Sequence, residues 1–312
     1  MEEQALTVRK SGQINVVLQK KLDISRNTAA ESAPLLAIDV LEEHSPLLEI
    51  EEEMNHLVGM DAIKQNIKEI YAWITVNARR EEKGLKSEKQ ALHMMFKGNP
   101  GTGKTTMARL IGKMFAKMNV LSKGHLIEAE RADLVGEYIG HTAIKTRDLV
   151  KKACGGILFI DEAYSLGRGG EKDFGREAID ALVKQMEDKQ HEFVLILAGY
   201  PEEMDQFLKM NPGLVSRFQI VIDFPNYSID QLMEINDKML LERQYFFSQE
   251  AMGVLRNHLE KILGSGPSHF SNGRYIRNII EKSIRMQALR VLQQDLYDRH
   301  ELMMLRKCDL IL

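Results

Sequence analysis

The feature that most constrains this chain is a glycine-rich loop between an apolar run and a helix-like segment. The loop, residues 98–106, fits the phosphate-binding pattern G-x-x-x-x-G-K-[ST]. An apolar run at 91–96 precedes it and an amphipathic stretch at 107–118 follows, which is the strand–loop–helix context that the pattern needs. Glycines let backbone N–H groups approach a polyphosphate, and the helix behind adds the positive end of its dipole. We therefore expect a nucleotide-phosphate site here.

Single residues of this loop have separate expected roles. The Lys104 side chain is expected to reach the β- and γ-phosphates, and the Thr105 hydroxyl to ligate Mg²⁺. The rest of the loop is expected to surround the nucleotide with its backbone, at Asn99, Pro100, Gly101, Thr102, Gly103 and Thr106. The bare pattern also arises by chance, so a second motif is needed to support it.

That second motif is an apolar run that ends in two carboxylates. Residues 155–160 read GGILFI, and Asp161 and Glu162 follow. A continuous apolar run suits a parallel strand that is covered on both faces, and ligands bind beyond the carboxyl ends of such strands. We expect Asp161 to hold Mg²⁺ and Glu162 to orient or deprotonate the attacking water. Taken alone, the pair is equally consistent with a strand that ends in solvent.

Composition narrows the class of protein. The chain has 312 residues, a net charge of −3 and a pI of about 6.3, so it lacks the basic footprint of a nucleic-acid-binding protein. We find neither a transmembrane-length apolar stretch nor a signal-peptide core, and we expect a cytoplasmic protein without a membrane partner. The two cysteines, Cys154 and Cys308, have no metal-ligand spacing.

Strand-like and helix-like segments alternate between residues 53 and 226, which predicts an α/β fold with a parallel five-stranded sheet. The expected strands are 91–96, 126–129, 155–160, 193–198 and 220–222. The apolar spacing at 63–74 predicts a helix, and the charged residues 79–90 are interpreted as a linker to the first strand. We expect this domain to be the large nucleotide-binding one.

Two further parts flank this domain. Residues 227–312 show helical periodicity, with Leu232, Ile235 and Met239 on one face of the first helix, and we expect a small helical domain there. Residues 1–52 form an N-terminal extension, which includes a possible short strand at 14–18. Two interpretations of this extension stay open, a solvated and partly flexible leader or a segment that docks a regulator.

Together these motifs resemble the AAA+ ATPases over residues 53–290. The stretches 136–142, 197–200 and 211–214 are similar to the CbbX-type branch, which includes red-type Rubisco activases and a bacterial sporulation protein; 93–98 and 128–136 match the sporulation member better. The resemblance implies a P-loop NTPase core followed by a helical lid. It also implies ATP as the nucleotide and hydrolysis to ADP and phosphate.

The resemblance also assigns residues around the nucleotide. Val58 and Gly59 are similar to the segment that backs the adenine ring. Tyr200 stands where many relatives place a polar sensor of the γ-phosphate, although it is equally a plain strand-end tyrosine. Arg274 resembles the second sensor, on the lid, with Arg277 as the alternative.

Other implied residues act outside the chain's own nucleotide site. Arg217 resembles the arginine finger, which would complete the site of a neighbouring subunit in a homo-oligomeric ring, expected to be a hexamer. Tyr138, Ile139 and Gly140 resemble the pore loop that grips a protein client, or else form an ordinary turn. Residues 167–170 form either a second pore-facing loop or a flexible one.

Several functions remain to be compared. The leading hypothesis is an ATP-driven protein remodeller required for spore maturation, with Rubisco activation as the alternative. A nucleic-acid-dependent motor or loader needs a basic stripe, which the charge balance disfavours. A scaffold that uses ATP only as a switch is disfavoured by Lys104, Asp161 and Glu162, and we identify no acceptor pocket for a small-molecule kinase.

Overall fold

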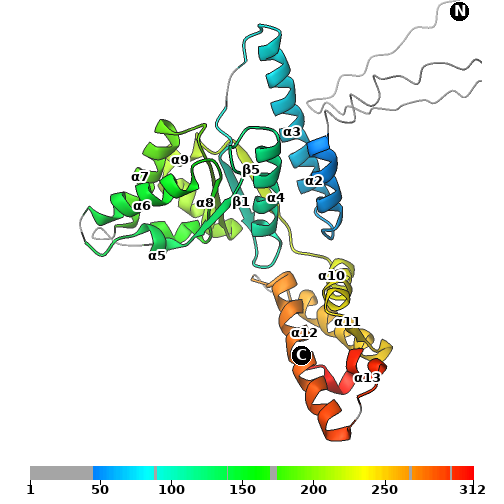
Figure 1. Cartoon of the computed structure of the whole chain (residues 1–312). Helices are drawn as coiled ribbons and strands as arrows, with labels where there is room; N and C mark the ends of the chain where they lie inside the picture. The colour runs from blue at the N-terminus through cyan, green and yellow to red at the C-terminus, as the bar shows by residue number, and fades with distance from the viewer. Residues whose placement is uncertain (1–44, 88–89, 139, 169–173, 267–268, 296) are drawn as a thin grey trace, which may run out of the picture. The chain divides into compact units, whose positions relative to one another are not determined.

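A computed structural model gives the fold of the chain and describes residues 45–87, 90–138, 140–168, 174–266, 269–295 and 297–312 (Figure 1). The possible strand at 14–18, like everything before residue 45, lies outside the described residues. Residues 43–312 form one compact unit. Its larger part, the core, is an α/β domain that ends with the fifth strand, and its smaller part, the lid, begins at residue 228.

A parallel five-stranded sheet is the centre of the core. Its strands are β1 (Met94–Gly98), β2 (Leu126–Ala129), β3 (Ile157–Ile160), β4 (Val194–Gly199) and β5 (Ile220–Phe224). The order across the sheet is β2-β3-β4-β1-β5, and every pair is parallel. The predicted fold class is therefore confirmed. All the carboxyl ends lie along one edge, which places the loop after β1 beside the residues that follow β3 and β4.

Helices cover both faces of the sheet (Figure 1). Alternate strand residues face opposite sides: Phe96 packs into one buried cluster with Ile63 and Phe115, and Met95 into another with Phe207. The first face carries α2 (Ser45–Asn55), α3 (Asp61–Glu82) and α4 (Lys104–Lys117). The second carries α5 (Arg131–Leu134), α6 (His141–Ala153), the 3₁₀ turn η1 (Ala163–Gly167), α7 (Gly175–Asp188), α8 (Pro201–Met210) and α9 (Pro212–Val215). Burial on both faces explains why the strands read as continuous apolar runs.

The interpretation of residues 79–90 as a linker is wrong at its beginning. Helix α3 continues through Arg79 to Glu82, and these two side chains form an ion pair of 2.8 Å at the i,i+3 spacing. Arginine and glutamate are good helix formers, so a charged helix end resembles a charged linker when only apolar periodicity is considered. The first strand also begins later than expected, at Met94.

The lid is mostly helical, as expected. Its helices are α10 (Ile229–Glu242), α11 (Gln249–Gly264), α12 (Asn272–Gln294) and α13 (Arg299–Met303), followed by the 3₁₀ turn η2 (Lys307–Asp309). A small parallel pair of strands, β6 (Phe246–Phe247) and β7 (Met304–Leu305), was not predicted. Strands of two residues are too short to show an alternating pattern.

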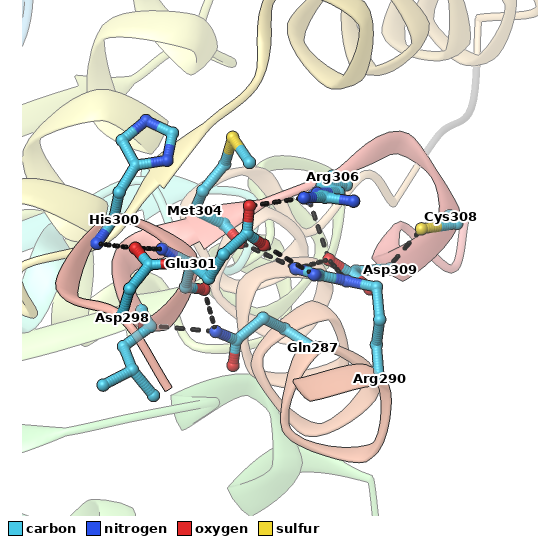
Figure 2. Close-up of polar contacts among 10 residues, drawn as sticks. Gln287, Arg290, Asp298, His300, Glu301, Met304, Arg306, Cys308 and Asp309 are labelled. Carbon is cyan, nitrogen blue, oxygen red and sulfur yellow. Dashed lines mark hydrogen bonds and ion pairs between the residues drawn. The ribbon is translucent and has the colours of Figure 1, made fainter. Parts of the chain in front are cut away.

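A buried ionic cluster fastens the last residues of the lid to α12 (Figure 2). The side chain of Arg290, 9% exposed, pairs with Asp309 through Nε at 2.9 Å and with Glu301 through Nη1 at 2.9 Å. Its Nη2 donates to the Met304 carbonyl at 3.1 Å. Arg306 also contacts Glu301. We call these side chains the lid clamp, because they join α12, α13 and η2.

Candidate functional site

A cavity of about 1270 Å³ lies between the carboxyl edge of the sheet and the lid. Many of the predicted site residues line it: Val58, Pro100, Gly101, Gly103, Lys104, Thr105, Thr106, Asp161, Glu162, Tyr200 and Arg274, together with the alternative Arg277. The charged groups on its walls are of both signs. The basic ones are Lys104, Arg131, Lys145, Lys238, Arg243, Arg274 and Arg277. These seven basic side chains give the cavity several partners for an anion.

The phosphate loop holds its lysine without a ligand. Lys104 begins α4, and its Nζ donates to the carbonyls of Gly98 at 2.8 Å and Asn99 at 2.9 Å. Burial lowers the pKa of Lys104, and the nearby carboxylate of Asp161 opposes this shift. A desolvated ammonium that bonds neutral carbonyls gains more from an anionic partner than a solvated one does. The geometry therefore suits polyphosphate binding.

The two carboxylates after β3 differ in their surroundings. Asp161 is half-buried, and its Oδ1 accepts from the Glu162 N–H at 3.0 Å. Glu162 is exposed and has a left-handed backbone, with φ 48° and ψ 43°. Both line the cavity with Thr105. The Thr105 hydroxyl and the Asp161 carboxylate are hard oxygen donors, the type that Mg²⁺ prefers.

The lid approaches the phosphate loop closely at Gly101. This glycine has φ 69°, and a Cβ there would lie 2.4 Å from the Ser271 carbonyl oxygen and 2.6 Å from the Arg274 nitrogen. The Gly273 N–H donates to the Gly101 carbonyl at 3.1 Å. Only a residue without a side chain fits this contact. The start of α12, and Arg274 with it, is thus held against the loop.

The opposite end of the cavity is apolar on two sides. Leu57 and Val58 line it from the core, while Ile235 and Met239 line it from α10 of the lid. The periodicity had placed Ile235 and Met239 on one face of the helix with Leu232; Leu232 is fully buried, and the other two are partly buried and also line the cavity. Gly59 does not line the cavity; a Cβ there would lie 2.4 Å from Nε2 of Gln231.

Tyr200 and the two lid arginines all reach the cavity. Tyr200 follows β4 and is half-buried, and its ring contacts Tyr164 at 5.8 Å and His269 at 4.9 Å between centroids. Burial raises the pKa of Tyr200, with a further contribution from Glu162. Arg274 acts electrostatically on Lys104, which places it near the phosphate loop. Arg277 lines the same cavity.

Other predicted residues lie elsewhere. Asn99 and Thr102 belong to the loop but are not among the cavity-lining residues, and the same holds for Arg217, Tyr138 and Gly140 in the described part of the chain. Ile139 and residues 169–170 lie outside the described residues. Arg217 instead forms an ion pair with Glu187 of α7 and donates to the Gly213 carbonyl. The Tyr138 side chain is 65% exposed.

Comparison with known proteins gives the family. Residues 94–226 match the model of the ATPase family associated with various cellular activities (AAA), and residues 228–311 match the AAA lid domain. The chain is 64% identical to stage V sporulation protein K of Bacillus subtilis (strain 168), over 99% of this chain and 97% of the relative. This chain belongs to the AAA ATPase family.

Further relatives include the protein CbbX of Cereibacter sphaeroides and a chloroplastic ribulose bisphosphate carboxylase/oxygenase activase of Cyanidioschyzon merolae. CbbX is 42% identical to this chain, over 85% of this chain and 86% of CbbX. The activase is 43% identical, over 75% of this chain and 80% of the activase. The AAA domain of FIGL-1, solved in complex with ADP, has the same fold, with a TM-score of 0.55 and 18% identity over 81% of this chain and 80% of that one. The expected resemblance to CbbX-type AAA+ ATPases is confirmed.

Membership makes this AAA ATPase an enzyme that binds nucleotide and hydrolyses ATP. Family members typically oligomerise. Within the residues that the structure describes, no helix is long and apolar enough to cross a membrane.

Sequence reasoning missed several residues of the site of this AAA ATPase. Tyr227 lines the cavity, and its hydroxyl donates to the Thr102 carbonyl at 3.2 Å. Burial raises the pKa of Tyr227 to about 12, so it remains a neutral donor. Asn272 is fully buried at the start of α12. Neither residue was given a role from the sequence, because their partners are distant in sequence and periodicity and spacing carry no signal of such contacts.

Proposed function

We propose that this chain is an ATP-driven protein remodeller that works as a homo-oligomeric ring, a hexamer, in the cytoplasm during sporulation. The observation that supports assembly into a ring is the position of Arg217. The other groups proposed for hydrolysis line one cavity, whereas Arg217 is absent from the described residues of its wall and stays partly exposed on another surface. An arginine finger in that position serves a neighbouring subunit's site.

Each residue of the site then has one task. Lys104 binds the β- and γ-phosphates, and the loop from Asn99 to Thr106 surrounds them with N–H groups. Thr105 and Asp161 would hold Mg²⁺, which neutralises phosphate charge when it is bound. Glu162 orients the attacking water.

Three further contacts complete the nucleotide site. Val58 backs the adenine from the core, with Gly59 behind it outside the cavity wall, while Arg274 contacts the phosphates from the lid. Tyr200 donates its hydroxyl proton toward the γ-phosphate. Lid and core thus both contact one nucleotide, so hydrolysis of that nucleotide changes the position of the lid relative to the core.

The client side is proposed for the loop of Tyr138, Ile139 and Gly140. A large aromatic side chain that is 65% exposed and outside the cavity is available to another molecule. Gly140 precedes α6 and has φ 81°, a backbone angle that a residue with a Cβ rarely adopts. The relatedness to stage V sporulation protein K supports a sporulation client, and the activase relative supports an inhibited Rubisco as the alternative.

The ring is tested by mixing two inactive variants. Arg217→Ala is expected to keep nucleotide affinity and to lose about 10³-fold in ATPase rate, as other arginine fingers do. A Lys104→Ala subunit cannot bind ATP tightly in its own site, but its intact Arg217 can still complete the site of a neighbouring subunit. Mixed rings should regain part of the activity, whereas Arg256→Ala, which changes an exposed lid arginine, should be active alone. No recovery in verified mixed rings would argue against a finger that acts between subunits.

The client class is tested by stimulation of the ATPase. Unfolded polypeptide is expected to raise the rate, and single-stranded DNA or RNA to leave it unchanged. Stimulation by nucleic acid alone would reject the remodeller. The sporulation role is tested by complementation of a Bacillus subtilis strain that lacks the related protein. The wild-type chain should restore spore formation, and failure of a well-expressed chain would favour the alternative client.

A further inference from the structure

Three asparagines from three separate segments meet beside the phosphate loop. Asn99 belongs to the loop, Asn226 to the connection between β5 and the lid, and Asn272 is the first residue of α12. Oδ1 of Asn226 accepts from Nδ2 of Asn99 at 2.9 Å and from Nδ2 of Asn272 at 2.9 Å. A continuous chain of side-chain amides therefore joins the phosphate loop, the connection and the lid.

Both polar atoms of the Asn272 side-chain amide form hydrogen bonds. Asn272 is 0% exposed, and its Nδ2 also donates to the Phe270 carbonyl at 2.8 Å and the Pro100 carbonyl at 3.3 Å. Its Oδ1 accepts from the Tyr227 N–H at 3.0 Å. The backbone at Asn272 has φ 44°, a left-handed value that asparagine tolerates better than most side chains. The position thus requires a donor, an acceptor and this backbone conformation together.

The loop end of the amide chain contacts the groups that bind phosphate. The carbonyl of Asn99 accepts from Lys104 Nζ at 2.9 Å and from Thr102 Oγ1 at 2.8 Å. A bound polyphosphate competes for the ammonium of Lys104, because its anionic oxygens attract the positive charge more strongly than the neutral carbonyl of Asn99 does. Filling the loop therefore changes the bonding of Asn99, whose side chain holds Asn226.

We propose that Asn99, Asn226 and Asn272 form an amide relay that couples occupancy of the phosphate loop to the position of the lid, with Asn272 as a positioning residue for ATP hydrolysis. Asn272 fixes the start of α12, and Arg274 lies two residues further along the chain. The relay sets how α12 presents Arg274 to the cavity. This inference rests on the proposed phosphate contact of Arg274; its lid-position readout is a distance within one chain, so it does not depend on Arg217 of a neighbouring subunit or on a client.

The test uses isosteric replacements. Asn272→Asp replaces the donating Nδ2 with an acceptor that faces the oxygens of Asn226, Phe270 and Pro100, so the hydrogen bonds become repulsive contacts. Asn226→Asp keeps an acceptor in the same place, because Asn226 serves both neighbours through Oδ1. Asn257→Asp adds the same charge on the exposed side of α11 and is the matched control.

Each variant is measured for ATP affinity, ATPase rate and lid position. Lid position is the spin–spin distance between nitroxides at Lys184 of α7 and Glu260 of α11, both exposed, with Cys154 and Cys308 replaced by serine. In the parent, ATP should narrow the distance distribution. Asn272→Asp should bind ATP with an affinity within about threefold of that of Asn226→Asp. Its kcat should fall by about tenfold or more relative to the parent, as expected when hydrogen bonds to a buried group are lost. Its distance distribution should not narrow when ATP is added. Asn226→Asp, whose added charge also lies near the phosphate loop, should keep the parent's kcat and narrowing even where ATP affinity falls, and Asn257→Asp should behave as the parent in all three measurements.

Two results would overturn the relay. One is an Asn272→Asp protein with the parent's kcat and the parent's response to ATP. The other is equal damage from Asn226→Asp, because the direction of the hydrogen bonds would then not matter. If Asn272→Asp does not fold, Asn226→Leu is the deciding variant, because it changes an exposed residue and removes the acceptor that Asn99 and Asn272 share. It should lose both the ATP-dependent narrowing of the distance distribution and the parent's ATPase rate. Retention of both would reject the proposal.

Discussion

Replacing Arg290 by methionine tests whether the lid clamp holds the end of the lid in place. Arg290→Met keeps most of the apolar stem but removes the charge between Glu301 and Asp309. The Asp309 side chain is 2% exposed and that of Glu301 is 12% exposed, so both carboxylates stay buried without their main partner. Breaking a buried ion pair from one side costs about 3 to 5 kcal/mol. Because Arg306 still contacts Glu301, we expect about 3 kcal/mol.

Amide hydrogen exchange in the full-length chain measures this cost directly. A loss of about 3 kcal/mol raises the opening equilibrium of residues 300–310 by roughly a hundredfold or more, since 1.4 kcal/mol is tenfold. Arg256→Met is the matched control: it removes an ion pair with Asp230 whose side chains are 47% and 83% exposed, worth about 0.5 kcal/mol. Equal exchange in the two variants would refute the argument that burial makes the clamp important.

Three further outcomes are expected. Lys104→Ala should lose tight ATP binding, whereas Glu162→Gln should bind ATP and lose turnover; calorimetric titration and phosphate release separate the two, and normal hydrolysis in both would show that the site is misassigned. Tyr138→Ala should keep basal ATPase within about an order of magnitude but lose client-coupled work, because truncating an aromatic anchor costs roughly 2 kcal/mol; wild-type behaviour in a client assay would reject the threading role. The hydrogen bond from Arg290 chiefly lowers the pKa of Glu301, so the clamp is fully present above the ordinary carboxyl pKa near 4 and weakens as pH falls below about 4. The opening equilibrium of residues 300–310, taken as the exchange rate divided by the intrinsic amide rate at each pH, should rise there and stay flat between pH 5 and 8.

The inner strands β3 and β4 were predictable because they are buried on both faces, which requires apolar residues at every position. The run before Asp161 and the run before Tyr200 therefore stood out without any alternation. The phosphate loop was equally visible, because its backbone has positive φ at Gly101 and Gly103 and passes close to neighbouring atoms, which favours glycine at both positions. These two constraints are local, so a single sequence displays them.

Contacts between distant segments were not predictable in this way. Asn272 contacts Pro100 across 172 positions, and as a polar residue at the beginning of a helix it resembles any helix start. Arg217 gave no sign of its ion pair with Glu187, because the partner lies on another helix. The strands β6 and β7 are two residues each and owe their pairing to the packing of the lid.

The backbone of Glu162 has a consequence for how variants of this enzyme are selected. A left-handed conformation costs an ordinary L-residue about 1 kcal/mol, and asparagine or glycine less. Replacing Glu162 by asparagine therefore relieves strain while it removes the carboxylate. Glu162 is also the residue that we propose orients the attacking water, so replacements that raise stability there are expected to lower activity. On that proposal, a screen that ranks variants of this enzyme by thermal tolerance alone would enrich inactive proteins at residue 162, and activity has to be selected alongside heat resistance.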